Sequence, residues 1–260
     1  MKVKVCALFA MVLFSSLSFL YGQQESKPTR LLIMQDVVYP YKAEAYEKAQ
    51  KEMNEFIVKN YPSISWKCLQ YDNYIYDYIV DLADYDKIDE MNKMWEEKMK
   101  TVNQDEFKKY ADAFIGTISA TNQFVVTKDK KGSYEAKDPF VKPGGGKFYH
   151  WDYFEFIPGK EDEALQVARD EASLCEKLNL KGSFNLWHIS MGQNTNAYVY
   201  ASSDKNRLDF FTNMEADNKV TGKQMDELDK KFMSYVQKFD HWNGKTRPEL
   251  SITAMNTANQ

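Results

Sequence analysis

The stretch from residue 148 to residue 163 reads FYHWDYFEFIPGKEDE and holds a junction between a strand and a helix. Aromatic residues dominate its first part, which predicts an extended strand over 148–157. Pro158 and Gly159 then interrupt the strand, and the acidic run Glu161 to Glu163 is typical of the first turn of a helix. The helix itself is predicted by apolar residues at helical spacing, namely Leu165, Ala168, Ala172, Cys175 and Leu178.

The same order of elements occurs twice in the chain. The second half continues with predicted strands at 183–191 and 196–201 and with helices whose apolar residues are Leu208, Phe211, Met214, Met225, Leu228, Phe232, Tyr235 and Phe239. The first half has a predicted strand at 31–39, a helix from Pro40, extended runs at 64–70 and 74–82, and helices over 88–99 and 107–118. Matched positions such as Tyr78 and Tyr198 favour a tandem repeat, and chance similarity between two α+β stretches is the alternative.

The predicted organisation has five parts. They are a signal peptide at 1–22, a first repeat at 31–126, a linker or loop at 127–147, a second repeat at 148–243 and a C-terminal tail at 244–260. The linker is indicated by its lysines and by three consecutive glycines, Gly144 to Gly146.

Strand, helix, strand, strand and helix in each half resembles the ferredoxin-like unit of the dimeric α+β barrel superfamily. The most specific piece is the Pro158-Gly159-Lys160 turn, whereas the first half has Pro40-Tyr41-Lys42 without the glycine. The resemblance implies an α+β fold in which tandem ferredoxin-like repeats pack sheet to sheet as a barrel within one chain. Members of the superfamily include cofactor-free monooxygenases, haem-degrading enzymes and chlorite-dismutase-like haem proteins, so the resemblance leaves the function open.

Residues 1–22 have the pattern of a secretory signal peptide. Lys2 and Lys4 precede the apolar run 5–13, and Gly22 is a small residue suited to cleavage. The apolar run is too short to cross a bilayer, although an N-terminal anchor is the alternative. We therefore expect a secreted or periplasmic protein without membrane contact after cleavage.

Composition and charge narrow the class of partner. The chain is 43% hydrophobic and 28% charged, as a globular protein is. Loss of Lys2 and Lys4 with the signal peptide leaves 32 basic residues against 38 acidic ones, a net charge of −6. This acidic balance argues against nucleic acid as a partner. Of the remaining cysteines, Cys68 lies in an extended run and Cys175 on a helix stripe, so we predict two buried thiols and not a disulfide.

Tyrosines alternate along one strand of each half. If the aliphatic side chains of these strands face helices, a tyrosine row faces the barrel interior, where phenols bind planar aromatic ligands by stacking and hydrogen bonding. The predicted ligand-binding residues are Tyr74, Tyr76, Tyr78, Tyr198 and Tyr200. The alternative is that these tyrosines only pack the sheets together.

All three histidines lie in the second half, each beside a tryptophan. His150 shares a strand face with Asp152, which can orient or charge its imidazole for acid/base catalysis. We predict His150, Asp152 and His188 as catalytic candidates, with haem as a cofactor that either histidine could ligate and buried structural histidines as the alternative. His241 is predicted near a helix end capped by Gly244, where a protonated imidazole interacts favourably with the helix dipole.

Three functions remain open from the sequence. The first is an exported protein, monomer or homodimer, that binds a small apolar or aromatic ligand between its two sheets. The second is a cofactor-free monooxygenase or haem-handling enzyme, and the third is a structural or interaction module with a filled barrel. The sequence contains no phosphate-binding loop, calcium loop, zinc spacing or serine-hydrolase elbow, and we therefore predict no metal site.

Overall fold

The computed structural model describes residues 29–60, 64–192 and 194–253. The predicted signal peptide at 1–22 lies outside the described residues. Within them, no helix is both long enough and apolar enough to cross a membrane.

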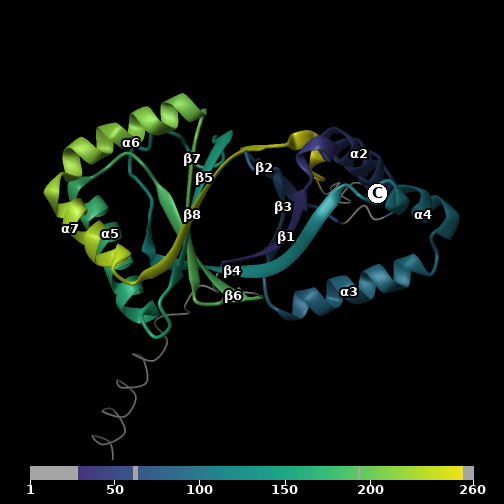
Figure 1. Cartoon of the computed structure of the whole chain (residues 1–260), viewed down its shortest axis with the longest axis horizontal. Helices are drawn as coiled ribbons and strands as arrows, with labels where there is room; N and C mark the ends of the chain where they lie inside the picture. The colour runs from purple at the N-terminus through teal and green to yellow at the C-terminus, as the bar shows by residue number, and fades with distance from the viewer. Residues whose placement is uncertain (1–28, 61–63, 193, 254–260) are drawn as a thin grey trace, which may run out of the picture.

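Eight antiparallel strands close into one barrel (Figure 1). The strands are β1 (Arg30–Val38), β2 (Lys67–Tyr71), β3 (Ile75–Leu82), β4 (Ile118–Tyr134), β5 (Phe148–Phe156), β6 (Phe184–Met191), β7 (Ala197–Asp204) and β8 (Val236–Thr246). Their order around the barrel is β1-β3-β2-β8-β5-β7-β6-β4. The first four strands thus lie in the order β4-β1-β3-β2 and the last four in the equivalent order β8-β5-β7-β6.

Two groups of helices flank the barrel on opposite sides (Figure 1). Beside the first four strands lie η1 (Pro40–Lys42), α2 (Ala43–Asn60), α3 (Asp86–Met99) and α4 (Gln104–Asp112). Beside the last four lie α5 (Glu161–Leu178), α6 (Arg207–Thr221) and α7 (Lys223–Met233), and the short helix η2 (Pro248–Leu250) follows β8. Local sequence determines where two of these helices begin or end. The Asn103 side chain accepts hydrogen bonds from two backbone N–H groups in the first turn of α4, and Asn179 adopts a left-handed conformation that ends α5.

The barrel interior and the helix-facing sides form separate cores. Side chains alternate along each strand, so that Ile75, Asp77 and Ile79 of β3 point inward while Tyr76 and Tyr78 point towards the helices. The buried interior cluster comprises Ile33, Leu69, Tyr71, Ile75, Val126, Trp151, Tyr153, Trp187, Ile189, Ala197 and Val199.

Two strands are absent from the sequence-based prediction. The linker expected at 127–147 is in part strand β4, which pairs with β1 and then with β6. Its end bulges between Asp129 and Tyr134 and exposes Lys130 and Lys131, so it lacks the apolar alternation that marks a strand. The helix expected to run through Phe239 ends at Met233, and β8 follows. Most β8 side chains are exposed, which hides the strand from a pattern based on burial.

Other predictions agree with the structure. The strand at 31–39 and the helix after it correspond to β1 and α2, and the junction at 148–163 corresponds to β5, a turn with Gly159 at φ 82°, and α5. Cys68 and Cys175 are both buried and free, as predicted.

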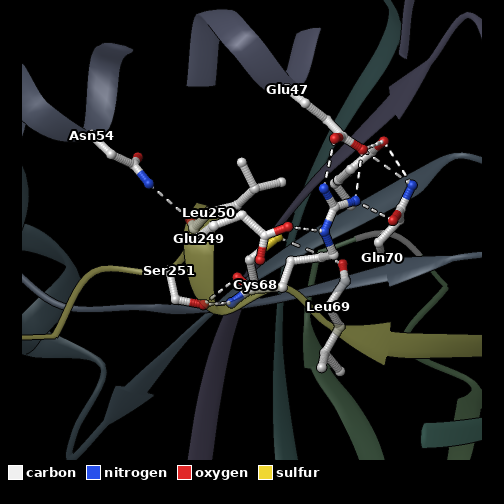
Figure 2. Close-up of polar contacts among 10 residues, drawn as sticks. Glu47, Asn54, Cys68, Leu69, Gln70, Glu249, Leu250 and Ser251 are labelled. Atoms are coloured by element: carbon white, nitrogen blue, oxygen red, sulfur yellow. Dashed lines mark hydrogen bonds and ion pairs between the residues drawn. The ribbon is translucent and has the colours of Figure 1, made fainter. Parts of the chain in front are cut away.

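Arg247 anchors the segment after β8 to helix α2. Its Nη1 and Nη2 donate to the two carboxylate oxygens of Glu47 at 2.6 Å each, and its Nε donates to Glu249 at 2.7 Å. Nη1 also donates to the side-chain oxygen of Gln70. Figure 2 shows Glu47 and Gln70 converging on this point from different elements. Because the Arg247 side chain is only 10% exposed, the ion pair is a buried one that joins α2, β2 and the C-terminal segment.

Candidate functional site

The predicted tyrosine row does not face the barrel interior. Tyr76 donates a hydrogen bond to Glu47 of helix α2 at 2.8 Å, and the hydroxyls of Tyr78 and Tyr46 lie 2.8 Å apart. In the second half, Tyr200 donates to Glu171 of helix α5 at 2.6 Å. These hydroxyls therefore find their partners on the helices.

The assignment of strand faces was wrong for a steric reason. Small residues of β7, Ala197 and Val199, point inward, where they make room for Trp151 and Trp187. Tyr198 instead packs in the helix-facing core with Phe156, and its ring stacks on His188 with the centroids 4.9 Å apart.

Tyr74 belongs to neither face. It lies in the turn between β2 and β3 with a positive φ of 60° and is 37% exposed.

The catalytic candidates of β5 also lie outside the interior. His150 contacts Asn243 Oδ1 through Nδ1 at 2.9 Å and Asp152 Oδ1 through Nε2 at 3.0 Å, and its ring packs against Phe210 of α6 at 4.9 Å. Burial lowers the pKa of His150, but Asp152 and Asn243 together raise it above its ordinary value. His241 lies in β8, not at a helix end, with its ring 6.1 Å from that of His150. The structure thus brings His150 and Asp152 together on the face of the sheet next to α6.

His188 is separate from this group. Its Nε2 donates to the carbonyl oxygen of Thr195 at 2.9 Å, and its ring rests on Tyr198. The acid/base role of His150, Asp152 and His188 stays a prediction.

Haem is one cofactor that the superfamily resemblance implies, and no histidine of this chain is placed to ligate it inside the barrel. The chain has three histidines, all within the described residues, and each lies on a strand face opposite to the interior residues Trp151, Trp187 and Trp242. Both ring nitrogens of His150 already have partners. An interior haem would therefore have no histidine ligand from this chain.

The interior instead contains a cavity of about 240 Å³. Its apolar wall consists of Phe124, Trp151, Tyr153, Ile189, Val199 and Trp242, and its polar lining consists of Gln35, Thr121, Asn122, Gln123, Asn194, Lys238 and Asp240. Because all neighbouring strands are antiparallel, β1 and β5 end at the same end of the barrel at which β4 and β8 begin. The cavity lies towards this end.

Aromatic rings in and beside the cavity are locked together. Tyr153 stacks on Trp242 with the centroids 6.0 Å apart and an angle of 17° between the planes. Tyr71, just beyond the wall, meets Trp151 at 5.6 Å and Trp242 at 5.7 Å. Asn194 donates to the Tyr153 hydroxyl at 3.0 Å, which further fixes this ring. The wall is thus a preformed aromatic surface.

A row of polar side chains leads from the cavity to a buried acid. Asn122 Nδ2 donates to Gln35 Oε1 at 2.9 Å, and Gln35 Nε2 donates to Asp77 Oδ1 at 3.0 Å. Asp77 is completely buried, and this burial raises the pKa of its carboxyl to about 7 from an ordinary value of 3.8. Neither Asp77 Oδ2 nor the nearby Tyr71 hydroxyl reaches a hydrogen-bond partner among the described residues. Buried polar atoms without partners are rare, and these two lie close enough for the Tyr71 hydroxyl to lower the pKa of the Asp77 carboxyl.

Sequence reasoning missed these interior residues. One signal was available, because Asp77 is an acid between the aromatic and aliphatic residues Ile75 to Val80 of β3. Its significance depended on the face assignment, which placed Tyr76 and Tyr78 inside and Asp77 against the helices.

Comparison with known proteins gives a likeness in fold. No protein-family model matches the chain, and no curated protein matches it in sequence. Among solved structures it is similar to an anthrone oxidase-like protein, with a TM-score of 0.59 and 11% identity over 86% of this chain and 92% of that one. The fold is an α+β barrel.

Two further solved structures resemble the chain more distantly. A candidate monooxygenase from Fusobacterium nucleatum subsp. nucleatum has a TM-score of 0.48 and 14% identity, over 84% of this chain and 92% of that one. Chlorite dismutase from Candidatus Nitrospira defluvii, solved in complex with imidazole, has a TM-score of 0.45 and 10% identity, over 87% of this chain and 93% of that one. At such identities the likeness concerns the fold alone, and function has to be argued from the site.

Proposed function

We propose that this protein binds a compact aromatic small molecule in the interior of its barrel. The observation that carries the proposal is the cavity of about 240 Å³ walled by Trp151, Tyr153 and Trp242. Its six apolar or aromatic and seven polar lining residues combine a stacking surface with hydrogen-bonding groups, as small-molecule sites do.

The shape of the cavity limits the size of the ligand. Pockets for drug-sized ligands have volumes of roughly 300–1,000 Å³, so this cavity suits a smaller molecule of one or two fused rings. The parallel rings of Tyr153 and Trp242 favour a planar ligand that lies against them. Gln35 and Asn122 at the polar side then meet its hydroxyl or amine substituents.

The proposal extends to the architecture and location of the protein. We treat the two halves as tandem ferredoxin-like units, which the equivalent strand orders β4-β1-β3-β2 and β8-β5-β7-β6 support. Export rests on the signal-like pattern of residues 1–22. A monomer is sufficient for the site, because every residue of the cavity comes from one chain.

Replacing Trp242 by Ala should weaken the binding of 1-naphthol at least about tenfold, since a large aromatic wall of the site is removed. The matched control is Phe239→Ala on the same strand, because Phe239 lies on the opposite face and is 46% exposed. Equilibrium dialysis with 1-naphthol measures both affinities. Equal losses in the two variants, or no binding to the wild-type protein, would overturn the proposed site.

Oxidation of the bound ligand is a second candidate function. The observation that favours it is Asp77, a buried carboxyl with a pKa of about 7, which is connected to the cavity through the hydrogen bonds of Gln35 and Asn122. The solved anthrone oxidase-like protein shares this fold, but anthrone has three fused rings, which is more than the cavity suits, so the first compound to test is 1-naphthol. Dioxygen uptake on addition of 1-naphthol, absent in Asp77→Asn, would support oxidation, and no uptake would leave binding alone.

A further inference from the structure

We propose that Asp77 sets the hydrogen-bonding polarity of the cavity, so that the site selects aromatic ligands that donate a hydrogen bond over ligands that only accept one. The inference rests on the proposed function, because it concerns the ligand of the same cavity. Asp77 does not line the cavity and acts through Gln35 and Asn122, so it is a positioning residue.

The polarity begins at the buried carboxylate. An ionised carboxylate only accepts hydrogen bonds, so the Gln35 amide has to present its NH₂ group to Asp77 Oδ1, as it does at 3.0 Å. The carbonyl oxygen of the same amide, Oε1, is then directed away from Asp77 towards Asn122. A flipped Gln35 amide would place its Oε1 against Asp77 Oδ1 in a buried position, where two acceptors would face each other without a hydrogen.

The orientation passes on to the second amide. Since Gln35 Oε1 accepts, Asn122 has to donate, and its Nδ2 does so at 2.9 Å. The Asn122 carbonyl oxygen therefore lies on the side of its amide away from Gln35, and both amides line the cavity. Gln35 Oε1 keeps a second lone pair, and Asn122 meets Gln35 through Nδ2 and not through its carbonyl oxygen, so both carbonyl oxygens retain accepting capacity for a ligand hydroxyl.

The charge state of Asp77 controls how firmly this polarity is held. The groups that act on its carboxyl are Gln35 and Asp36 from β1 and Tyr71 and Cys68 from β2. Burial, together with the nearby Asp36, raises its pKa, and the polar side chains of Gln35 and Tyr71 oppose this rise. When protonated, Asp77 has an O–H group that can donate to a flipped Gln35 amide, so the lock is strict only above neutral pH.

The test compares 1-naphthol, which donates a hydrogen bond, with 1-methoxynaphthalene, which only accepts one, by equilibrium dialysis. At pH 8 the wild-type protein should bind 1-naphthol about tenfold more tightly, the effect of one hydrogen bond in a buried site. In Asp77→Asn the ratio should fall to within about twofold, because the introduced amide can meet either end of the Gln35 amide. The wild-type ratio should also fall at pH 5.5.

Two further variants separate positioning from structure. Glu171→Gln changes another buried acid, which lies on the helix-facing side with Tyr200, and should keep the wild-type ratio. Asn122→Leu removes the amide at the cavity end of the row. Because Asn122 is only half-buried, this variant should fold even if Asp77→Asn does not, and it should lose the preference for 1-naphthol. A preference that persists in Asp77→Asn or Asn122→Leu overturns the inference while leaving the proposed function intact. If neither compound binds the wild-type protein, the proposed function fails and the inference falls with it.

Discussion

Replacing Asp77 by Asn should stabilise the protein at pH 8 by an amount on the order of 4 kcal/mol, and by less than about 1 kcal/mol at pH 4. The reason is that Asp77 is fully buried and its pKa is raised from 3.8 to about 7. A carboxyl that binds its proton more tightly in the folded state favours folding at low pH, and that contribution is lost as the pH rises from about 4 to about 7.

Denaturant unfolding of both proteins at the two pH values measures this effect. The Asp77→Asn change keeps the shape of the side chain and an oxygen that accepts from Gln35, so the removed charge is the main difference. Asp81→Asn is the matched control, because Asp81 lies on the same strand and is exposed, and it should have little effect at either pH. A stabilisation by Asp77→Asn that is equal at pH 4 and pH 8 would show that the buried charge is not its cause.

Replacing Arg247 by Met should destabilise the protein by on the order of 3–5 kcal/mol, as is typical when one partner of a buried ion pair is removed. The Arg247 side chain is 10% exposed, and it makes two parallel hydrogen bonds of 2.6 Å to Glu47. The variant leaves the Glu47 carboxylate, 21% exposed, without its cation and also releases Gln70 and Glu249.

A second arginine in the chain provides the control. Arg207 contacts Asp72 at a similar distance of 2.8 Å, but the two side chains are 58% and 63% exposed. Arg207→Met should therefore cost less than about 1 kcal/mol. Chemical unfolding measures the free energy lost in each variant, and the two ion pairs differ mainly in burial. Similar losses in both variants would contradict a stabilising role for the buried Arg247 pair. Adding Glu47→Leu to Arg247→Met should recover part of the loss, because the Glu47 carboxylate is then no longer left without its cation.

Elements with strong local signals could be predicted from the sequence. The Pro158-Gly159 turn and the acidic start of α5 lie where the pattern placed them, because turn residues and helix-start charges act locally. Strands β4 and β8 were not predicted, because they are held by neighbours far away in the chain and expose much of their length. The alternation of apolar and polar residues in the sequence therefore does not identify such strands.

The candidate site was predicted less well than the fold, for a single geometric reason. Alternation along β3 and β7 identified two faces correctly but not which face points inward, and reversing them exchanges Tyr76 and Tyr78 for Ile75 and Asp77. The choice depends on partners across the barrel and on the helices, such as Glu47 and Glu171, which no local pattern reveals.

A buried acid that lowers stability at neutral pH also bears on function. Natural proteins retain such destabilising groups mainly where a site needs them. Asp77 has this character, and the row through Gln35 and Asn122 connects it to the cavity. The stability and selectivity effects of Asp77→Asn are therefore expected to have one origin.

The position of the bound ligand tests the central claim most directly. Nuclear Overhauser effects between the ring protons of 1-naphthol and the protein report which side chains lie next to the ligand. We expect contacts with Trp151, Trp242 and Val199 of the interior. Contacts with Phe211 and Phe239 instead, which are exposed on the outer side of the second half, would contradict an interior site.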